Sequence, residues 1–272
     1  MKLTKGSKTL IEEVKEEFYS GLMVDVFDNI TSEEVYKQRA AQIIELIKSY
    51  NPNAKTLLEL ACGTGNFTRQ LVKAKFVITA TDISKGEIEK ARTKGIRATF
   101  SVADMSKLNT SKEYDVVCCF WESFRYLHSY KAAQDTLKRI FKSLKHNGLF
   151  FVDFSYFPPH DKPFKIPTYT INLGKGLCVL KQTSVLTKGN FDTRWDDMQY
   201  QLNGKDITGQ KIEWKWRTVF LKPKLSRAPL LRITREKMEQ MLTKAGFNIL
   251  EVLYGFAGCP ESMLFVAQKK MV

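Results

Sequence analysis

Between Thr56 and Phe154, short apolar runs alternate with segments of helical periodicity, and no other feature limits the possible folds as strongly. Strands that alternate with helices pair through crossovers into a mostly parallel sheet, and near-continuous apolar strands are buried on both faces. We therefore predict an α/β fold with helices on both faces of the sheet. The predicted strands are Thr56–Ala61, Phe76–Thr81, Ile96–Val102, Tyr114–Phe120 and Leu149–Phe154, and the predicted helices span about 66–74, 84–94 and 131–145.

The C-terminal residues complete this sheet. A helix is predicted after Thr234, which is an N-cap candidate, and it ends at Gly246 in the C′ position. The runs Phe247–Leu253 and Ser262–Gln268 then predict a final strand pair. Together with the five preceding strands they give a Rossmann-like, seven-stranded, mostly parallel sheet.

Residues 156–233 have a different pattern, with little helical periodicity and frequent turn signals. The β-rich runs Leu177–Leu186, Phe191–Leu202 and Ile212–Leu221 predict an antiparallel β insertion. At the other end of the chain, residues 10–20 and 33–49 are predicted helices. The expected organisation is an N-terminal helical segment (1–50), an α/β core (51–155), an antiparallel β insertion (156–233) and a C-terminal helix with strands that complete the core sheet (234–272).

The insertion also carries most of the net positive charge of the chain. The formal net charge of the chain is +14, and residues 156–235 hold 15 basic and six acidic residues, a surplus of nine. A local surplus favours an anionic partner such as a phosphate group, whereas a lysine-rich surface without a ligand is the alternative. The arginines that are candidates for binding phosphate are Arg194, Arg217, Arg227 and Arg232.

Apolar segments and cysteines are the sequence features that bear on the location of the protein. No apolar run approaches the ~20 residues of a membrane helix, and the first 21 residues lack the apolar region of a signal peptide. The five cysteines have no metal-type spacing, so we predict no metal site and reduced thiols in a cytoplasmic protein without a membrane partner.

The segment Leu57–Thr68 combines a strand, a glycine turn and a helix start. Gly63 and Gly65 can adopt positive φ and let a ligand approach the backbone. Thr68 stands where a dinucleotide fingerprint has its third glycine, so a pyrophosphate is not favoured. Glu59 inside the strand suits a ligand with cationic groups. A tight structural turn is the alternative interpretation.

Acidic residues follow the next two strands. Asp82 comes 19 residues after Gly63, a spacing that suits a carboxylate accepting both ribose hydroxyls, although it can also cap a helix. Asp104 could accept from an adenine amino group while Met105 packs on the ring. Trp121 lies past the fourth strand, where open α/β sheets bind ligands, and core packing is its alternative role.

The run Glu-Leu-Ala-Cys-Gly-Thr-Gly at 59–65, with Asp82 and Asp104 in register, resembles the class I S-adenosylmethionine-dependent methyltransferases. The segments Phe120–Leu127 and Ser155–Pro158 and the layout of the insertion resemble the sugar N,N-dimethyltransferases, which are similar to glycine N-methyltransferase. The resemblance implies S-adenosyl-L-methionine as cofactor. The cofactor-binding residues it implies are Glu59, Ala61, Gly63, Gly65, Asp82, Ile83, Asp104, Met105, Phe120 and Trp121.

The same resemblance places an active-site His or Tyr at Tyr126, where a phenol could hydrogen-bond an amine or take its proton through water. Glu122 and His128 are the nearby alternatives. Val24–Asp28 matches the lid segment of the family, but Phe27 stands where the family commonly has Tyr.

The expected function is methylation of a small molecule, most simply an amine such as a nucleotide-linked aminosugar or another secondary metabolite. An RNA methyltransferase that uses the basic insertion is an alternative, but the chain lacks a separate RNA-binding module, so a nucleic-acid partner is not favoured. A catalytically inactive cofactor-binding module is the third interpretation, and a homodimer is left open. The acceptor atom is not determined, because this fold serves carbon, nitrogen and oxygen acceptors.

Overall fold

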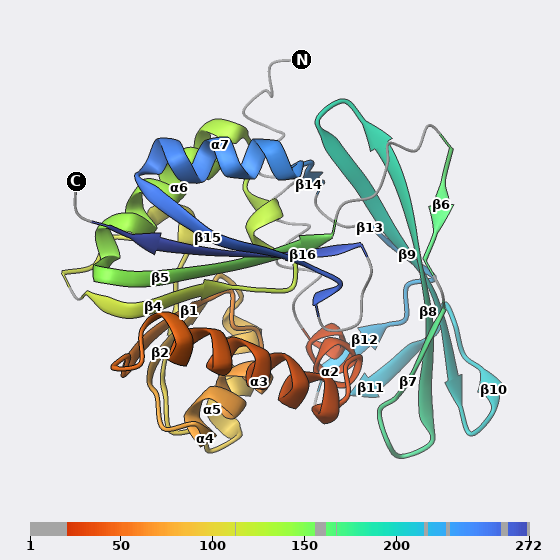
Figure 1. The fold of residues 1–272 in the computed structure, drawn as a ribbon. Helices are drawn as coiled ribbons and strands as arrows, with labels where there is room; N and C mark the ends of the chain where they lie inside the picture. Colours follow the sequence, from red (N-terminus) through yellow and green to blue (C-terminus); the bar gives the residue numbers. More distant parts are fainter. Residues whose placement is uncertain are drawn as a thin grey trace. The chain divides into compact units, whose positions relative to one another are not determined.

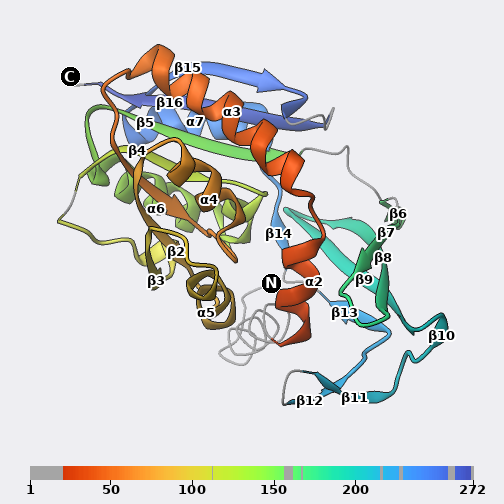
Figure 2. The same ribbon diagram turned by 90° about the horizontal axis from the view of Figure 1, so that it is seen from below.

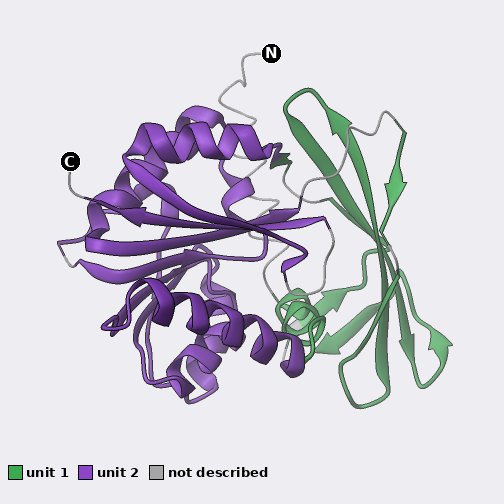
Figure 3. Cartoon of the chain, viewed as in Figure 1, with its two compact units in different colours: residues 1–32, 159–230 green, residues 33–158, 231–272 purple. Residues whose placement is uncertain are grey.

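The computed structural model describes residues 21–111, 113–155, 162–166, 168–214, 217–226, 229–256 and 261–270. The chain divides into two compact units (Figure 3): unit 1 comprises residues 1–32 and 159–230, and unit 2 comprises residues 33–158 and 231–272. The expected N-terminal segment 1–50 is thus divided between the units after Ser32. The predicted helix over 10–20 lies outside the described residues.

Unit 2 contains, in the part of the chain that the structure describes, a seven-stranded sheet in the order β15-β16-β5-β4-β1-β2-β3 (Figure 1). Neighbours among β1 to β5 are parallel, whereas β16 is antiparallel to both β5 and β15. The predicted Rossmann-like sheet is therefore confirmed. Its strands are β1 (Thr56–Leu60), β2 (Val77–Asp82), β3 (Thr99–Val102), β4 (Tyr114–Cys119), β5 (Leu144–Ser155), β15 (Phe247–Tyr254) and β16 (Ser262–Lys269).

Helices cover both faces of this sheet. One face carries α3, α4 and α5, and the other carries α6 and α7 (Figures 1 and 2). On the first face Ile43, Leu71 and Ile88 join one buried apolar cluster with the strands, and on the second Phe141 contacts Phe247 with ring centroids 5.1 Å apart. The helices of unit 2 are α3 (Glu33–Tyr50), α4 (Asn66–Lys73), α5 (Lys85–Thr93), α6 (Tyr130–Ser143) and α7 (Arg235–Ala245).

Local capping explains where these helices begin and end. The hydroxyl of Thr234 accepts a hydrogen bond from the backbone N–H of Lys237 (3.2 Å), and Gly246 ends α7 with φ of 101°. Ser84 caps α5 and Ser129 caps α6 in the same way. The caps expected at Thr234 and Gly246 are both present.

The predicted start of one strand needs correction. β5 begins at Leu144, five residues before the predicted Leu149, and Asn147 lies inside it with φ of 59°. The register between β4 and β5 shifts between Tyr114 and Val116 of β4, because the irregular stretch of β5 around Asn147 lies opposite these two residues. The β-rich run Ile212–Leu221 forms two strands that pair antiparallel, β11 (Lys211–Trp214) and β12 (Arg217–Phe220).

Unit 1 is built on the long antiparallel pair of β8 and β9, as the insertion prediction requires. The helix α2 (Leu22–Asn29), which the sequence pattern did not predict, packs its Leu22, Met23 and Val26 into one apolar cluster with Val179 of β8. The strands of this sheet are, from N- to C-terminus, β6 (Phe164–Lys165), β7 (Tyr169–Asn172), β8 (Leu177–Lys188), β9 (Phe191–Leu202), β10 (Lys205–Asp206), β13 (Lys224–Ser226) and β14 (Leu230–Leu231).

Candidate functional site

The turn between β1 and α4 has the backbone that the two glycines suggested. Ala61, Gly63 and Gly65 all have positive φ, of 55°, 54° and 76°. A Cβ on Gly65 would lie 3.1 Å from the ring of Phe100, so this position requires glycine for space as well as for conformation. The turn leaves the carboxyl end of β1, the edge where open parallel sheets bind ligands.

Asp82 joins this turn to the end of β2. Its Oδ2 accepts the backbone N–H of Gly63 (2.9 Å), and its Oδ1 accepts the backbone N–H of Ser84 (2.8 Å). Burial raises the pKa of Asp82, and the backbone hydrogen bonds from Ser84 and Gly63 oppose that rise. The carboxylate therefore orients the glycine turn, and it lies at the sheet position expected for ribose binding.

Glu59 is the second buried carboxylate at this turn. The Thr68 hydroxyl donates to its Oε2 over 2.6 Å. Burial raises the pKa of Glu59 to about 8, the hydrogen bond from Thr68 opposes this, and the nearby Asp82 adds to it. A carboxyl group held in this way is stabilised in its ionised form by any cation that approaches, so the turn suits a cationic ligand.

Glu87 of α5 and Lys94, which directly follows α5, also contact the glycine turn, and the sequence pattern indicated neither. The carboxylate of Glu87 is buried, with Oε2 3.6 Å from the position of a Cβ on Gly63. Lys94 Nζ donates to Thr64 Oγ1 (2.9 Å) and to Asn66 Oδ1 (2.7 Å). The spacing Ser-x-x-Glu at 84–87 is a capping-box signal, which explains the start of α5 but does not indicate that this carboxylate reaches the turn.

The predicted adenine-side residues follow β2 and β3. Asp104 caps the short 3₁₀ helix η1 (Met105–Lys107), accepting the Ser106 N–H over 2.8 Å, and this hydrogen bond is the capping alternative of the sequence analysis. Ile83 is 49% exposed, and Val102, which pairs with Asp82 in the sheet, is 50% exposed. Exposed aliphatic side chains beside Asp82 provide an apolar surface that a flat ring could cover. The roles of Asp104, Met105 and Ile83 stay predictions.

The chain leaves β4 through an unusual turn. Phe120 is buried against the ring of Phe67, with centroids 4.9 Å apart. Trp121 and Glu122 both have φ of 61°. Bulky non-glycine residues rarely adopt this left-handed conformation, and such outliers concentrate at functional sites.

The Glu122 carboxylate is tied into the protein. Its Oε2 lies 3.1 Å from Arg125 Nη1, and its Oε1 accepts the Ser155 N–H over 3.3 Å. The Arg125 side chain is buried and also donates to the carbonyls of Leu231 and Ser155. These contacts favour an anchoring role for Glu122 over the role of a free base.

Tyr126 and His128 follow directly. Tyr126 ends the 3₁₀ helix η2 (Ser123–Tyr126) and is half-buried, whereas His128 is exposed. A half-buried phenol beside the β4 exit suits contact with a small ligand better than an exposed imidazole does. The structure thus brings Trp121, Glu122 and Tyr126 to the edge of the sheet that also carries the glycine turn, because β1 and β4 are parallel neighbours.

Arg39 of α3 and Asp153 of β5 complete this region. Arg39 Nη1 lies 3.1 Å from Asp153 Oδ2, and both side chains are buried. Burial raises the pKa of Asp153 to about 6, and Arg39 and the backbone N–H of Glu122 oppose the rise. The available sequence signals were a charge inside the apolar run Leu149–Phe154 and an arginine in the helical pattern of 33–49, and neither locates a partner.

The candidate phosphate-binding arginines that the structure describes belong to different units. Arg194 lies on β9 of unit 1 and is 6% exposed, whereas Arg232 belongs to unit 2 and is 9% exposed. Arg217 begins β12, but its side chain is outside the described part of the structure, as is all of Arg227. An anion-binding role for these residues stays a prediction.

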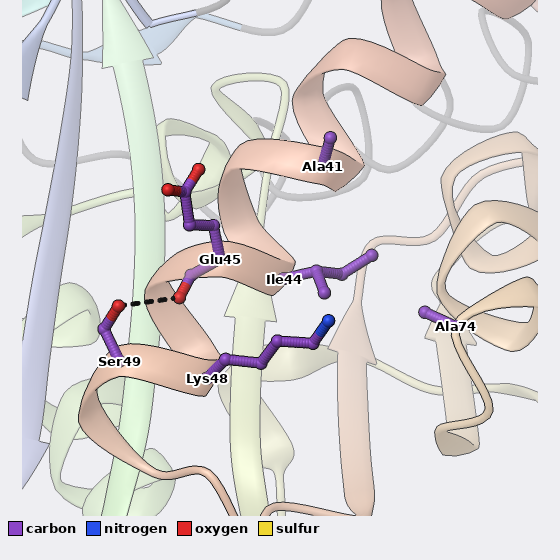
Figure 4. Close-up of a pocket in the computed structure, with 6 residues that line it drawn as sticks. All are labelled: Ala41, Ile44, Glu45, Lys48, Ser49 and Ala74. Carbon is purple, nitrogen blue, oxygen red and sulfur yellow. Dashed lines mark hydrogen bonds between the residues drawn. The ribbon is translucent and has the colours of Figure 1, made fainter.

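A groove on the outer side of α3 is lined by Ala41, Ile44, Glu45, Lys48, Ser49 and Ala74, with a hydrogen bond from Ser49 to the Glu45 carbonyl (Figure 4). The end of α3 precedes the start of β1, and Ala74 precedes the start of β2. The groove therefore lies toward the amino ends of the strands, away from the glycine turn.

The described residues hold no group of three or more His, Cys, Asp or Glu that could bind a metal ion. Among the helices that the structure describes, none has the length and apolarity needed to cross a membrane.

Comparison with known proteins agrees with this geometry. Residues 57–148, which span the glycine turn and the β4 exit, match the model of a methyltransferase domain. The chain is 24% identical to the dTDP-3-amino-3,6-dideoxy-α-D-glucopyranose N,N-dimethyltransferase of Streptomyces fradiae over 233 residues, which cover 85% of this chain and 86% of that protein.

Two further matches differ in extent. The malonyl-[acyl-carrier protein] O-methyltransferase of Priestia megaterium is 33% identical over 122 residues, 42% of each chain. Among solved structures, CalS10 of Micromonospora echinaspora, an amino pentose methyltransferase with bound S-adenosylmethionine, has a TM-score of 0.69. That match has 17% identity and covers 86% of this chain and 92% of the other, so it shows a shared fold.

Proposed function

We propose that this chain, a class I S-adenosylmethionine-dependent methyltransferase, methylates the nitrogen of a small-molecule amine. The observation that carries the proposal is the glycine turn with left-handed Gly63 and Gly65, joined by a 2.9 Å hydrogen bond to the Asp82 carboxylate. That turn lies on the same sheet edge as the half-buried Tyr126.

The donor groups at this edge fit the cofactor. Asp82 would accept from ribose hydroxyls, and Asp104 would accept from the adenine amino group. Ile83 and Met105 would pack on the adenine ring. Glu59 would face the cationic groups of the methionine portion, consistent with a carboxyl that burial keeps protonated until a cation arrives. When bound, the cofactor supplies a methyl group on a sulfonium centre.

The protein then has to position the acceptor amine relative to the methyl group. A neutral amine is already a nucleophile, so most of the rate comes from holding it in line, ~3–3.5 Å from the methyl carbon, in a dry site. We assign Tyr126 to hold the acceptor nitrogen by hydrogen bonding or to receive its proton through water. Glu122 is a weaker candidate because both its oxygens are already engaged.

An amine acceptor is favoured by the extent of similarity. The aminosugar N,N-dimethyltransferase resembles 85% of the chain, including much of unit 1, whereas the O-methyltransferase resembles 42%. Because the cofactor-binding core is common to many acceptors, similarity beyond the core carries more information about the acceptor. We therefore infer that unit 1 contributes to acceptor recognition and that the acceptor is a small polar amine.

Three finer points belong to the same proposal. The basic surplus of residues 156–235 supports an acceptor with an anionic group such as a nucleotide phosphate. Cys62, Cys118, Cys119 and Cys178 are free thiols, which supports the reducing environment of the cytoplasm. A homodimer is compatible with the fold.

The decisive experiment incubates the purified protein with isotopically labelled cofactor and matched pools of amines, phenols and carboxylic acids, and identifies products by mass. Labelled N-methyl product is expected from the amine pool. Product from phenols or acids alone would contradict the nitrogen assignment while leaving the methyltransferase assignment intact.

The anionic-acceptor proposal has its own measurement. For an acceptor with one or two phosphates, KM should rise modestly between low and moderate salt, because few charges are involved. A flat response would contradict an anionic acceptor, and a slope near one log unit per contacted phosphate would indicate nucleic acid.

A further inference from the structure

The turn after β4 holds two consecutive left-handed residues that are not glycine, Trp121 and Glu122, each with φ of 61°. A side chain as large as tryptophan disfavours this conformation, and such a turn persists only when the surroundings determine it. The question is which groups do so, since the local sequence has none of the residues that favour positive φ.

Asp153, from the end of β5, provides the first restraint. Its Oδ1 accepts the backbone N–H of Glu122 over 3.4 Å, and the side chain is 3% exposed. A buried carboxylate needs compensating partners, and this one uses the N–H that the left-handed turn directs toward it. The Asp153 carboxylate thus favours the left-handed conformation directly, because it binds the backbone of the turn itself.

Arg39, from α3, provides the second restraint. Its Nη1 binds Asp153 Oδ2 over 3.1 Å, and its guanidinium lies 3.7 Å from the centroid of the Trp121 ring. The edge of the Tyr36 ring packs against the same indole at 5.3 Å. One side chain therefore neutralises the carboxylate that holds the backbone and at the same time fixes the face of the indole.

Glu122, which follows Trp121, is held by a separate set of contacts. Glu122 pairs with the buried Arg125, whose guanidinium also donates to the carbonyls of Ser155 (3.1 Å) and Leu231 (3.0 Å). The buried pair of Arg39 and Asp153 and the partly buried pair of Arg125 and Glu122 thus meet at one turn. Burying charges is costly, and an apolar replacement would often be at least as stable, so stability alone does not explain why both pairs lie here.

We propose that Asp153 and Arg39 are positioning residues for methyl transfer: they hold the Trp121–Glu122 turn left-handed and thereby fix Trp121 and Tyr126 at the carboxyl edge of the sheet. This proposal rests on the proposed function. Neither residue needs to touch the acceptor or the cofactor. Their effect is on how precisely the groups that do touch them are placed, to which transfer rates are sensitive.

The test compares Asp153→Asn with a matched control, Asp115→Asn. Asp115 is also a carboxylate that accepts backbone N–H groups, from Lys55 and Thr56, and pairs with a cation, Lys145, but it lies at the amino ends of the strands. We expect Asp153→Asn to lower kcat about tenfold or more with cofactor affinity within about twofold, whereas Asp115→Asn leaves kcat within about twofold. Equal kcat losses in the two variants, or no loss in Asp153→Asn, would overturn the proposal.

A second pair of variants keeps the test decisive if Asp153→Asn does not fold. Arg39→Lys keeps a cation for Asp153 but loses the planar contact with Trp121, and Arg39→Met loses both. The expected order of kcat is wild type, then Arg39→Lys, then Arg39→Met. A folded Arg39→Met with wild-type kcat would overturn the proposal.

A readout without turnover separates this inference from the proposed function. Hydrogen exchange of the backbone amides over residues 119–127 should accelerate in Asp153→Asn and Arg39→Met but not in Asp115→Asn. Unchanged exchange in this segment contradicts the restraint itself. A wild-type protein that methylates no amine would contradict only the proposed function, and kcat is then measured with the acceptor that the screen identifies.

Discussion

The glycine turn after β1 and the turn after β4 lie at the same edge of the sheet, and both use positive φ. In the first, Gly63 and Gly65 adopt it without steric cost, and the restraining carboxylate, Asp82, ends the neighbouring strand. In the second, Trp121 and Glu122 adopt it, and the restraints come from α3 and β5.

This difference predicts different sensitivities. A turn made by glycine fails when a side chain is added, because nothing nearby can compensate for the lost conformation. A turn imposed on bulky residues fails when a distant partner is removed, while its own residues stay in place. Binding of the cofactor should therefore depend on the first turn, and turnover on the second.

The largest effect is expected from Gly63→Val. The position has φ of 54°, and a β-branched side chain would point toward the buried Glu87 carboxylate and the ligand side of the turn. Cofactor affinity, measured by calorimetry, should fall more than about 100-fold. Gly95→Val is the control, since Gly95 has φ of 64° with open space around it, and it should bind normally. Equal losses would mean that backbone strain, not the site, is responsible.

Asp82→Ala should come next. It removes the acceptors for the Gly63 and Ser84 N–H groups. It also removes the two proposed charge-assisted hydrogen bonds to the ribose, each worth about 1.5–3 kcal/mol. Cofactor binding should weaken at least about tenfold. Asp135→Ala, at an exposed pair with Lys131, serves as control. Normal affinity in a folded Asp82→Ala would contradict the cofactor assignment.

Tyr126→Phe tests the second turn. Loss of the hydroxyl should lower kcat about tenfold, or ~10²–10⁴-fold if Tyr126 is a general base, with cofactor affinity unchanged. Tyr130→Phe is matched, because its hydroxyl donates to the Arg232 carbonyl within the same region and should affect stability alone. Unchanged turnover in Tyr126→Phe would move the catalytic assignment to Glu122 or His128.

The smallest effect is a pH dependence at the glycine turn. Because burial raises the pKa of Glu59 to about 8, the folded protein keeps a proton that the unfolded chain, with its ordinary value of 4.5, has released. The free energy of unfolding should therefore fall as pH rises between those values, by an amount on the order of 1 kcal/mol or more relative to Glu59→Gln. Denaturant unfolding of both proteins across this range checks it, with the exposed Glu45→Gln as control. Parallel pH profiles for wild type and Glu59→Gln would refute it.

Much of the fold was predictable because it is written in local patterns. The apolar runs, the glycine turn and the caps at Thr234 and Gly246 all act within a few residues, and the structure has them where the pattern placed them. The predicted start of β5 was wrong because a long-range partner decides it: Leu144 pairs with Tyr114 of β4.

The candidate site divides in the same way. Gly63, Gly65, Glu59 and Asp82 could be chosen from the sequence, since spacing alone brings them to the ends of adjacent strands. The anchoring role of Glu122 could not be predicted from the sequence, because this role requires Arg125 and the Ser155 N–H to converge on the Glu122 carboxylate.

The sequence by itself determined the mostly parallel sheet, the antiparallel insertion and the glycine turn, because hydrophobic periodicity and backbone preference are properties of neighbouring residues. Only the tertiary structure decided that α3 packs with the sheet of unit 2 while α2 packs in unit 1. It also decided that Arg39 meets Asp153, 114 residues away. A charged residue within an apolar pattern of the sequence indicates that a partner is needed, but only the packing of the helix on the sheet determines which residue is that partner.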